Sequence, residues 1–153
     1  MDIENLVSIE EITGEDAEET ALLQEMGRNA IAYLSSFHWC PGIASGYLGY
    51  GVGGVMAAFL FNLNRKVAGT DDWLWAVVGD LPSAYFVTDE ATTAAAALEA
   101  YCGLMDDWCS AVEENRPLND VFLVRAAPTL EHARMLRSRL KYIRDVLVPQ
   151  ARL

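Results

Sequence analysis

The chain has 153 residues, 52% of them hydrophobic, and this length and composition favour one folded domain over a disordered chain. Three cysteines are too few for a disulfide scaffold. Eleven basic residues stand against 22 acidic ones, and the net charge of −11 argues against general attraction to nucleic-acid phosphates. We therefore expect a single domain over residues 1–153, with residues 1–12 less ordered, and no nucleic-acid partner.

The first predicted element is an amphipathic helix that begins after Thr13 and ends near His38. Residues 13–16 match a capping box with an acidic first turn. Apolar side chains then recur at steps of three and four residues, which is the period of a helix with one buried face. These positions are Leu22, Met26, Ala30, Tyr33, Leu34 and Phe37. Pro41 and Gly42 predict the end of this helix, because both residues interrupt helical backbone.

A glycine-rich stretch follows, and no charged residue occurs in residues 29–64. We interpret residues 42–54 as a loop that leads into a sheet. A membrane span within residues 43–63 is the alternative, but their glycines and moderate hydropathy favour the loop. Residues 49–54 satisfy the pattern G-x-G-x-x-G, yet they lack the preceding strand and following helix of a dinucleotide site. We therefore predict no membrane association and no cofactor.

Three strands of an antiparallel meander are predicted next. Residues 57–64 alternate in polarity, as in a half-buried strand. Residues 73–78 are apolar on both faces, which is typical of a central strand, and residues 84–87 form the third strand. Turn-forming residues at 67–72 and 79–83 connect these strands.

Two further amphipathic helices complete the chain. Thr88 or Asp89 is expected to cap the first of them, which ends before Pro117. Pro128 is expected in the first turn of the last helix, and Pro149 is expected to end it. The last helix should direct one apolar face into the core, formed by Ala133, Leu136, Leu140, Ile143 and Leu147.

The order of these elements predicts an α+β fold. Residues 121–124 are a short apolar run that fits either a fourth strand or a buried loop. The predicted architecture is an antiparallel β-meander of three strands, or four with residues 121–124, packed against three amphipathic helices. The order along the chain is α-β-β-β-α-(β)-α.

Charge is segregated along the chain. Residues 1–25 hold nine carboxylates and no basic residue, whereas seven of the 11 basic residues follow residue 124. Four of these lie three or four residues apart and so form one stripe on the last helix. They are Arg134, Arg137, Lys141 and Arg144. The simplest interpretation is that the stripe pairs within the chain, either with the acidic N-terminus or with the carboxylates of the second helix. An anion-binding strip and a two-signed surface for a protein partner are the alternatives that stay open.

Carboxylates are the other candidate binding residues. The start of the first helix contributes Glu15, Asp16, Glu18 and Glu19, and the turns contribute Asp71, Asp72 and Asp80. Asp80 follows a strand with two tryptophans. Capping of its own turn is the favoured role for its carboxylate, and partial desolvation beside the tryptophans is the alternative. The two histidines and three cysteines have no zinc-site spacing, and no catalytic residue or metal site is predicted.

Acidity motivates the functional hypothesis. We expect a small acidic cytoplasmic protein without enzymatic activity that binds a protein partner, as inhibitors and toxin-neutralising immunity proteins do. The cytoplasmic expectation rests on a start that lacks the basic and apolar regions of a secretory signal. The alternative is a small-molecule-binding or enzymatic domain with a pocket between the Gly42–Gly54 loop and the turn at Asp80. A homodimer is also open.

Overall fold

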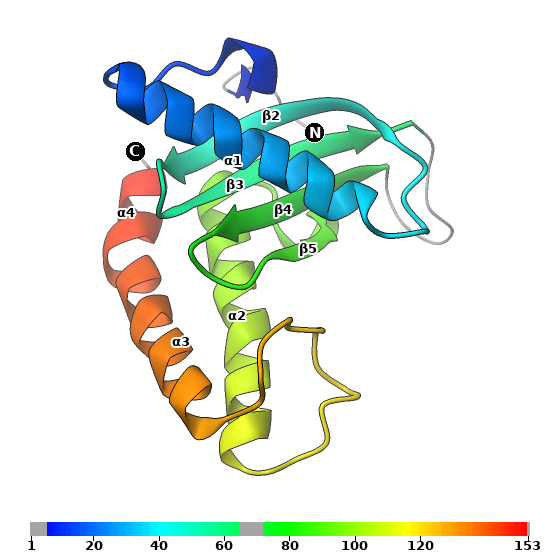
Figure 1. Cartoon of the computed structure of the whole chain (residues 1–153), viewed down its shortest axis with the longest axis vertical. Helices are drawn as coiled ribbons and strands as arrows, with labels where there is room; N and C mark the ends of the chain where they lie inside the picture. The colour runs from blue at the N-terminus through cyan, green and yellow to red at the C-terminus, as the bar shows by residue number, and fades with distance from the viewer. Residues whose placement is uncertain (1–5, 65–71, 153) are drawn as a thin grey trace.

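The computed structural model describes residues 6–64 and 72–152, and Figure 1 shows a sheet with helices on both of its faces. The strands are β1 (Val7–Ser8), β2 (Ile43–Val52), β3 (Met56–Leu63), β4 (Trp73–Gly79) and β5 (Ala84–Val87). The helices are η1 (Ile9–Glu11), α1 (Ala17–Ser35), η2 (Thr88–Glu90), α2 (Ala94–Glu113), α3 (Leu130–Tyr142), η3 (Ile143–Leu147) and α4 (Val148–Ala151). Most of the predicted turn at 67–72 lies outside the described residues.

The sheet is an antiparallel meander in the order β1-β2-β3-β4-β5, in which each strand pairs with its neighbour in sequence. The predicted α+β fold is therefore confirmed, with five strands in place of three or four. β5 has the predicted bounds, and β3 and β4 each differ from them by one residue. Residues 121–124 form a partly buried loop, so of the two alternatives for this run the loop is the one found.

The prediction of a loop over residues 42–54 is also wrong, because most of this stretch forms β2. Its glycines make room for aromatic side chains of the sheet and do not interrupt the strand. A Cβ atom at Gly46 would lie 2.6 Å from the Phe61 ring, and one at Gly49 would lie 2.8 Å from the Trp75 ring. Residues 43–63 thus fold as β2, a tight turn and β3. None of the described helices combines the length and the hydropathy that crossing a membrane requires.

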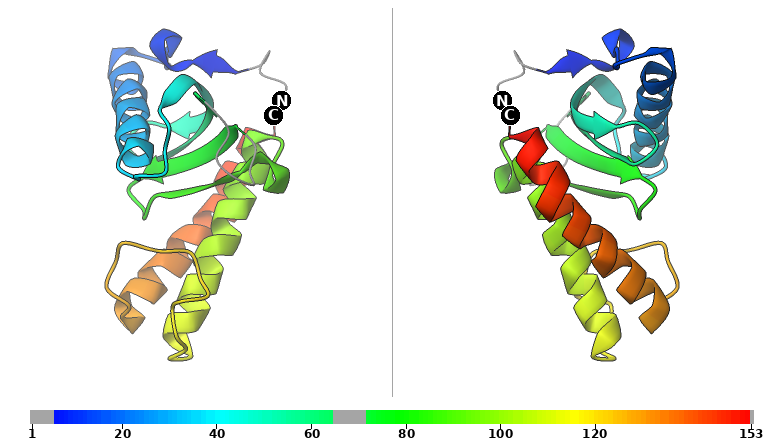
Figure 2. Two further views of the ribbon diagram at one scale, coloured as in Figure 1. Left: turned by 90° about the vertical axis from the view of Figure 1, so that its right-hand side faces the viewer. Right: turned by 90° about the vertical axis from the view of Figure 1, so that its left-hand side faces the viewer.

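The sheet is covered on both faces, by α1 on one side and by α2 with α3–α4 on the other (Figures 1 and 2). β3 is consequently buried almost throughout, so the prediction that it is half-buried is wrong. The core on the α1 side contains Leu23, Met26, Ala30, Leu34, Ala57, Phe59, Phe61, Ala76 and Val78. The core on the other side includes Met56, Leu60, Trp75, Val77, Leu98, Tyr101, Met105, Trp108 and Leu140. Alternate residues of β3 and β4 supply the two cores.

Helices α2 and α3 both begin later in the chain than the sequence predicts. Thr93 caps α2, because its side chain accepts a hydrogen bond from a backbone N–H of the first turn. Thr88 and Asp89 lie earlier, in the short helix η2. Thr129 caps α3 in the same way, which leaves Pro128 just before the helix.

The last helix continues past the residue expected to end it. Pro149 lies in α4, directly after the π-helical segment η3. Proline lacks an N–H and crowds the carbonyl of the preceding turn, and the wider π turn relieves both problems. The core positions predicted for this helix are confirmed. Ala133, Leu136, Leu140, Ile143 and Leu147 are all buried.

Candidate functional site

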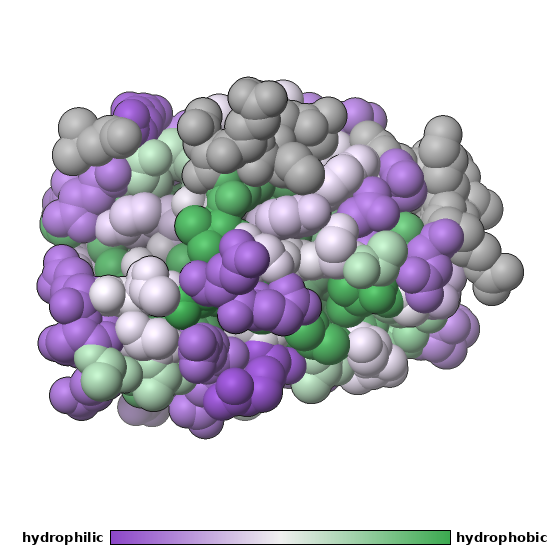
Figure 3. All heavy atoms as spheres, turned by 90° about the horizontal axis from the view of Figure 1, so that it is seen from above, coloured by the Kyte–Doolittle hydropathy of each residue, from purple (hydrophilic) through white to green (hydrophobic). Residues whose placement is uncertain are grey.

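The four predicted carboxylates at the start of α1 surround a hollow of about 580 Å³. The end of β2 and Gln150 of α4 form its other walls. The Tyr50 hydroxyl donates a hydrogen bond to Gln150 Oε1 at 2.7 Å and so links β2 to α4 across the hollow. In the space-filling view from above, hydrophilic residues gather at the end of the molecule where α1 begins (Figure 3). We call this hollow and its carboxylates the acidic hollow: Glu15, Asp16, Glu18 and Glu19.

Two of these carboxylates stabilise the local backbone, and the other two have no partner within the described residues. Asp16 is the N-cap of α1, where Oδ1 accepts a hydrogen bond from the Glu19 backbone N–H at 2.8 Å. The Glu19 carboxylate accepts hydrogen bonds from the Gly53 N–H at 3.0 and 3.2 Å, which holds the turn between β2 and β3. Glu15 and Glu18 are exposed, and neither forms an ion pair or hydrogen bond within the described chain. The acidic hollow therefore presents two free carboxylates to solvent.

The basic stripe runs from α3 into η3, and two of its cations, Arg137 and Arg144, pair with α2. The Arg137 guanidinium contacts Asp106 Oδ1 at 3.0 Å, Glu113 Oε1 at 2.7 Å and Ser110 Oγ at 2.9 Å, all on α2. Arg144 pairs with the other oxygen of Asp106. We call these five residues the α2–α3 seam. It pairs the stripe with α2, and no ion pair within the described residues joins it to the acidic start of the chain.

The remaining two residues of the stripe differ. Lys141 Nζ lies 2.7 Å from the Asp145 carboxylate, one helical turn further along. Arg134 is exposed and forms neither a hydrogen bond nor an ion pair within the described residues. The hydrogen bond from Arg137 lowers the pKa of Glu113 below its ordinary value, and the same contact raises the pKa of Arg137. Both groups are thus charged at neutral pH, and the Arg137 donors face α2 carboxylates.

Asp80 lies in the turn between β4 and β5, and its environment differs from the predicted one. Its side chain is 69% exposed, so the alternative of partial desolvation is wrong. Trp75 points into the core and Trp73 lies at the opposite end of β4, which leaves the turn projecting into water. The Asp80 carboxylate accepts a hydrogen bond from Arg139 Nη1 at 2.6 Å.

Three helices, α1, α2 and α3, hold this turn. The Tyr101 hydroxyl of α2 donates to the Pro82 carbonyl at 2.6 Å, and the Tyr33 hydroxyl of α1 donates to the Ser83 carbonyl at 3.3 Å. Arg139 of α3 also donates to the Asp80 carbonyl at 3.2 Å. Burial raises the pKa of both tyrosines, so each hydroxyl keeps the proton that it donates. These hydrogen bonds hold the turn in place, and surface hollows lie on either side of it.

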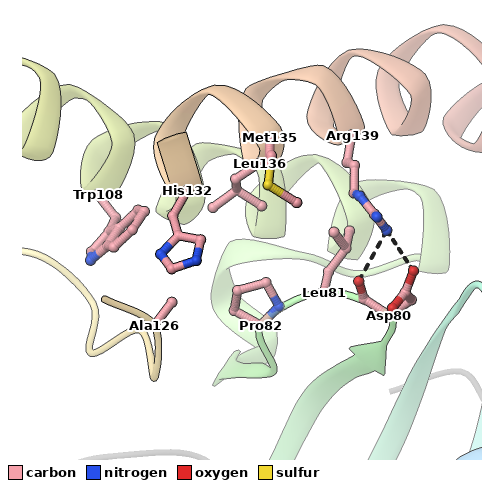
Figure 4. Close-up of a pocket in the computed structure, with 9 residues that line it drawn as sticks. All are labelled: Asp80, Leu81, Pro82, Trp108, Ala126, His132, Met135, Leu136 and Arg139. Carbon is pink, nitrogen blue, oxygen red and sulfur yellow. Dashed lines mark hydrogen bonds and ion pairs between the residues drawn. The ribbon is translucent and has the colours of Figure 1, made fainter. Parts of the chain in front are cut away.

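Between this turn, α2 and α3 lies a hollow of about 260 Å³ (Figure 4). Its walls are mainly apolar, formed by Leu81, Pro82, Trp108, Ala126, Met135 and Leu136. The His132 imidazole contributes a polar group, and its Nδ1 lies 2.9 Å from the Ala127 carbonyl oxygen. Arg139 is engaged with Asp80, as the dashed lines in Figure 4 show. The volume is below the roughly 300 to 1,000 Å³ of typical ligand pockets, so the hollow suits a small apolar group.

A second hollow, of about 380 Å³, lies on the α1 side of the same turn. Gly54, Gly79 and Asp80 border it, together with Glu25 and Asn29 of α1. It is therefore close to the place where the sequence suggested a pocket for a small molecule. The Gly54 turn between β2 and β3 provides that wall, and the glycine stretch before it is strand.

The aspartates before β4 do not join this site. Asp71 lies outside the described residues. Asp72 directly precedes β4, and its backbone carbonyl accepts a hydrogen bond from the Leu63 N–H at 2.8 Å. Asp80 follows β4, so Asp72 and Asp80 are separated by the length of that strand.

An aromatic hollow was missed by the sequence interpretation. It has a volume of about 320 Å³ and lies beside β5. Its lining comprises Tyr33, Phe37, Pro82, Ser83, Tyr85, Phe122, Leu123 and Arg125, and we call it the aromatic groove. The connection between α2 and α3, residues 114–129, supplies three of these side chains. That connection is longer than most loops, and such loops commonly carry function, so its length was the available signal.

Two of the three cysteines, Cys102 and Cys109, are buried. Burial raises the pKa of Cys102 and of Cys109 to about 11, so both thiols stay protonated at neutral pH. Within residues 6–64 and 72–152, histidine, cysteine, aspartate and glutamate side chains form no group of three that could hold a metal ion.

The fold and these hollows define an α+β protein whose surface offers free carboxylates, aromatic faces and apolar depressions. No protein-family model matches the chain, and no curated protein or solved structure matches it significantly.

Proposed function

We propose that this chain is a cytoplasmic protein without enzymatic activity that binds a basic protein partner, as an inhibitor or an immunity protein does. One observation supports the proposal most directly: some charged side chains are paired within the molecule and others are not. Two cations of the basic stripe, Arg137 and Arg144, are paired with α2 carboxylates in the α2–α3 seam. Glu15 and Glu18 of the acidic hollow have no partner within the described residues. Two unpaired carboxylates thus lie close together where α1 begins, in a hollow that also holds Asp16 and Glu19.

Such an arrangement suits electrostatic steering. Charges of one sign around a concave surface attract a partner of opposite sign over distances of about a Debye length, roughly 8 to 10 Å at physiological salt. The effect accelerates encounter more than it slows dissociation. Lysine or arginine side chains of the partner are the groups that would enter the acidic hollow.

The experiment compares retention of proteins from a lysate of the source cells on three immobilised forms of the chain. These are the natural protein, the Glu15→Lys/Glu18→Lys variant and an Asp107→Lys/Asp120→Lys control. All four replaced residues are exposed, and both variants change the net charge by the same amount. We expect a basic protein to bind the natural chain and the control at low salt, to leave at high salt, and to be lost from the Glu15/Glu18 variant.

The purified partner then gives the rate constants. We expect the Glu15/Glu18 variant to lower the association rate constant by about tenfold or more, with a smaller change in dissociation. Equal retention of every protein by the two variants, or binding that does not respond to salt, would contradict the proposal. Because both variants reverse the same number of charges, a difference between them measures the effect of where the charges lie.

A small-molecule-binding or enzymatic domain is the second candidate, and the hollow of about 380 Å³ beside Gly54 and Asp80 favours it. Its volume falls within the typical range for ligand pockets. A thermal-shift screen of metabolites tests it, with Asn29→Leu to fill the hollow. A ligand that raises the melting temperature of the natural chain and not of the variant supports this candidate. A ligand that raises the melting temperature of the natural chain and of the variant equally binds outside this hollow.

A further inference from the structure

The aromatic groove is the feature of the molecule that neither the fold nor the acidic hollow explains. Four rings meet in it, with centroids 5.2 Å apart for Tyr33 and Phe37, 5.0 Å for Phe37 and Tyr85, and 5.5 Å for Tyr85 and Phe122. Trp39 extends the cluster by stacking on Phe37 at 5.5 Å. These rings come from α1 and the residues after it, from β5 and from the connection before α3, so the fold assembles them from distant parts of the chain.

Arg125 gives the groove its only charged side chain. Its guanidinium lies over the rings of Tyr33 and Phe37, with 5.7 and 5.3 Å to their centroids. Within the described residues it forms no ion pair, although Arg137, Arg139 and Arg144 all do. A guanidinium stacked on aromatic faces is held in place while the N–H groups at its edge remain available to a carboxylate. The groove therefore combines an apolar depression with a fixed anion-binding edge.

The surroundings of the groove indicate a protein segment rather than a small molecule. Leu123 borders the depression with 72% of its surface exposed. A small ligand inside the depression would leave this side chain in water, whereas a peptide segment that crosses the rim would cover it. Tyrosine, tryptophan and arginine are also the residues that contribute most to protein-binding surfaces.

We propose that the aromatic groove binds a segment of another protein that places an apolar side chain among Tyr33, Phe37, Tyr85 and Phe122 and a carboxylate on Arg125. This surface is at the end of α1, and the acidic hollow is at its start, so each can be altered without the other. The inference goes beyond the proposed function, because it assigns a second surface with the opposite charge preference.

A phage-displayed library of random peptides tests the groove directly. We expect selection on the natural chain to enrich sequences in which Asp or Glu stands close to Leu, Phe or Trp. A synthetic peptide of the enriched sequence should then bind about tenfold or more weakly to Arg125→Gln, because a charged hydrogen-bond pair is lost. Replacing the peptide carboxylate by its amide should cost the natural chain the same factor and the Arg125→Gln variant almost nothing.

Two variants complete the design. Arg116→Gln is the matched control, since Arg116 lies in the same connection but pairs with Glu114 and does not line the groove. Leu123→Ser is expected to weaken the peptide several-fold without a change in folding, because its side chain is exposed. Enrichment that lacks acidic residues, or equal peptide binding by Arg125→Gln, would overturn the inference. So would a dimer in sedimentation that Leu123→Ser dissociates, because a second copy would then occupy the groove.

Discussion

The two faces of the sheet use their polar side chains in different ways. On the α2–α3 side, cations and carboxylates meet in the seam, where Arg137 alone contacts three residues of α2. On the α1 side, Glu15 and Glu18 lie unpaired at one end of the helix and Arg125 covers aromatic rings at the other. Charged side chains therefore join helices in the seam and remain accessible at the two ends of α1, as Arg134 also does on the α3 side.

The difference separates groups that act on stability from groups that are available for binding. A charge that is paired across two helices adds to folding, whereas an exposed unpaired charge is close to neutral for folding and free for a partner. Changes in the seam should thus alter unfolding, and changes at the ends of α1 should alter binding. Each prediction below compares one face with the other.

The largest effects are expected from leucines in the two cores. Leu140 on the α3 side is 1% exposed and Leu34 on the α1 side is 0% exposed. Leu140→Ala and Leu34→Ala should each lower the free energy of unfolding by about 2 to 5 kcal/mol, because each leaves a cavity. Urea unfolding measures both values, and Met135→Ala serves as the control since Met135 is 51% exposed.

Both leucine variants should unfold in one transition, since β3 and β4 contribute to both cores. Fluorescence and circular dichroism should report the same midpoint for each variant. Two separated transitions would mean that the two faces fold independently, contrary to the prediction of a single domain over residues 1–153.

Much of the fold is predictable because its elements have clear local patterns. The meander of β3, β4 and β5 follows from apolar runs between turn residues, and the buried positions of α3 follow from helical spacing. β2 is not predictable in this way, because a stretch rich in glycine is typical of a loop. The glycines fit a strand here because the rings of Phe61 and Trp75 lie close to Gly46 and Gly49. Only the tertiary structure supplies that contact.

The candidate sites are less predictable for the same reason. The sequence shows that Glu15, Asp16, Glu18 and Glu19 are close together, since they are neighbours on one helix start. It names the second helix as one of two possible partners for the basic stripe but does not decide between them. It gives no sign that Arg125 lies over Tyr33, because that contact joins residues far apart in the chain. Local periodicity thus locates faces of helices, whereas pairing across elements decides which charges stay free.

The next largest effect is expected in the seam. Arg137→Met should lower the free energy of unfolding by about 1 kcal/mol, because its three contacts are partly exposed and screened by water. Arg134→Met is the control, since Arg134 has no ion pair or hydrogen bond within the described residues. Urea unfolding at low and high salt measures the difference. If Arg137→Met and Arg134→Met lowered the free energy of unfolding equally, the contacts of the seam would contribute nothing to stability beyond the change in net charge.

The pH dependence of stability should show the effect of the ion pair between Arg137 and Glu113. Arg137 lowers the pKa of Glu113 below its ordinary value of 4.5 in the folded chain. The contribution of this carboxylate is therefore present above pH 4.5 and is lost as the pH falls through the lowered pKa. Acid titration of the urea midpoint should show a shallower loss in Arg137→Met than in the natural chain. An identical slope in both proteins would contradict the pairing.

The smallest effect on stability is expected from Glu15→Gln/Glu18→Gln. Glu18 lies in the first turn of α1, where its charge interacts favourably with the helix dipole, but it also stands among like charges of the acidic hollow. The two terms oppose each other, so the urea midpoint should remain unchanged while the association rate with the basic partner falls. Asp16→Ala gives the contrasting result, because it removes the N-cap and should lower stability by about 1 kcal/mol. If the Glu15/Glu18 variant destabilised the chain as much as Asp16→Ala does, these carboxylates would belong to the folded structure in the way that the seam does, and the two faces would no longer differ.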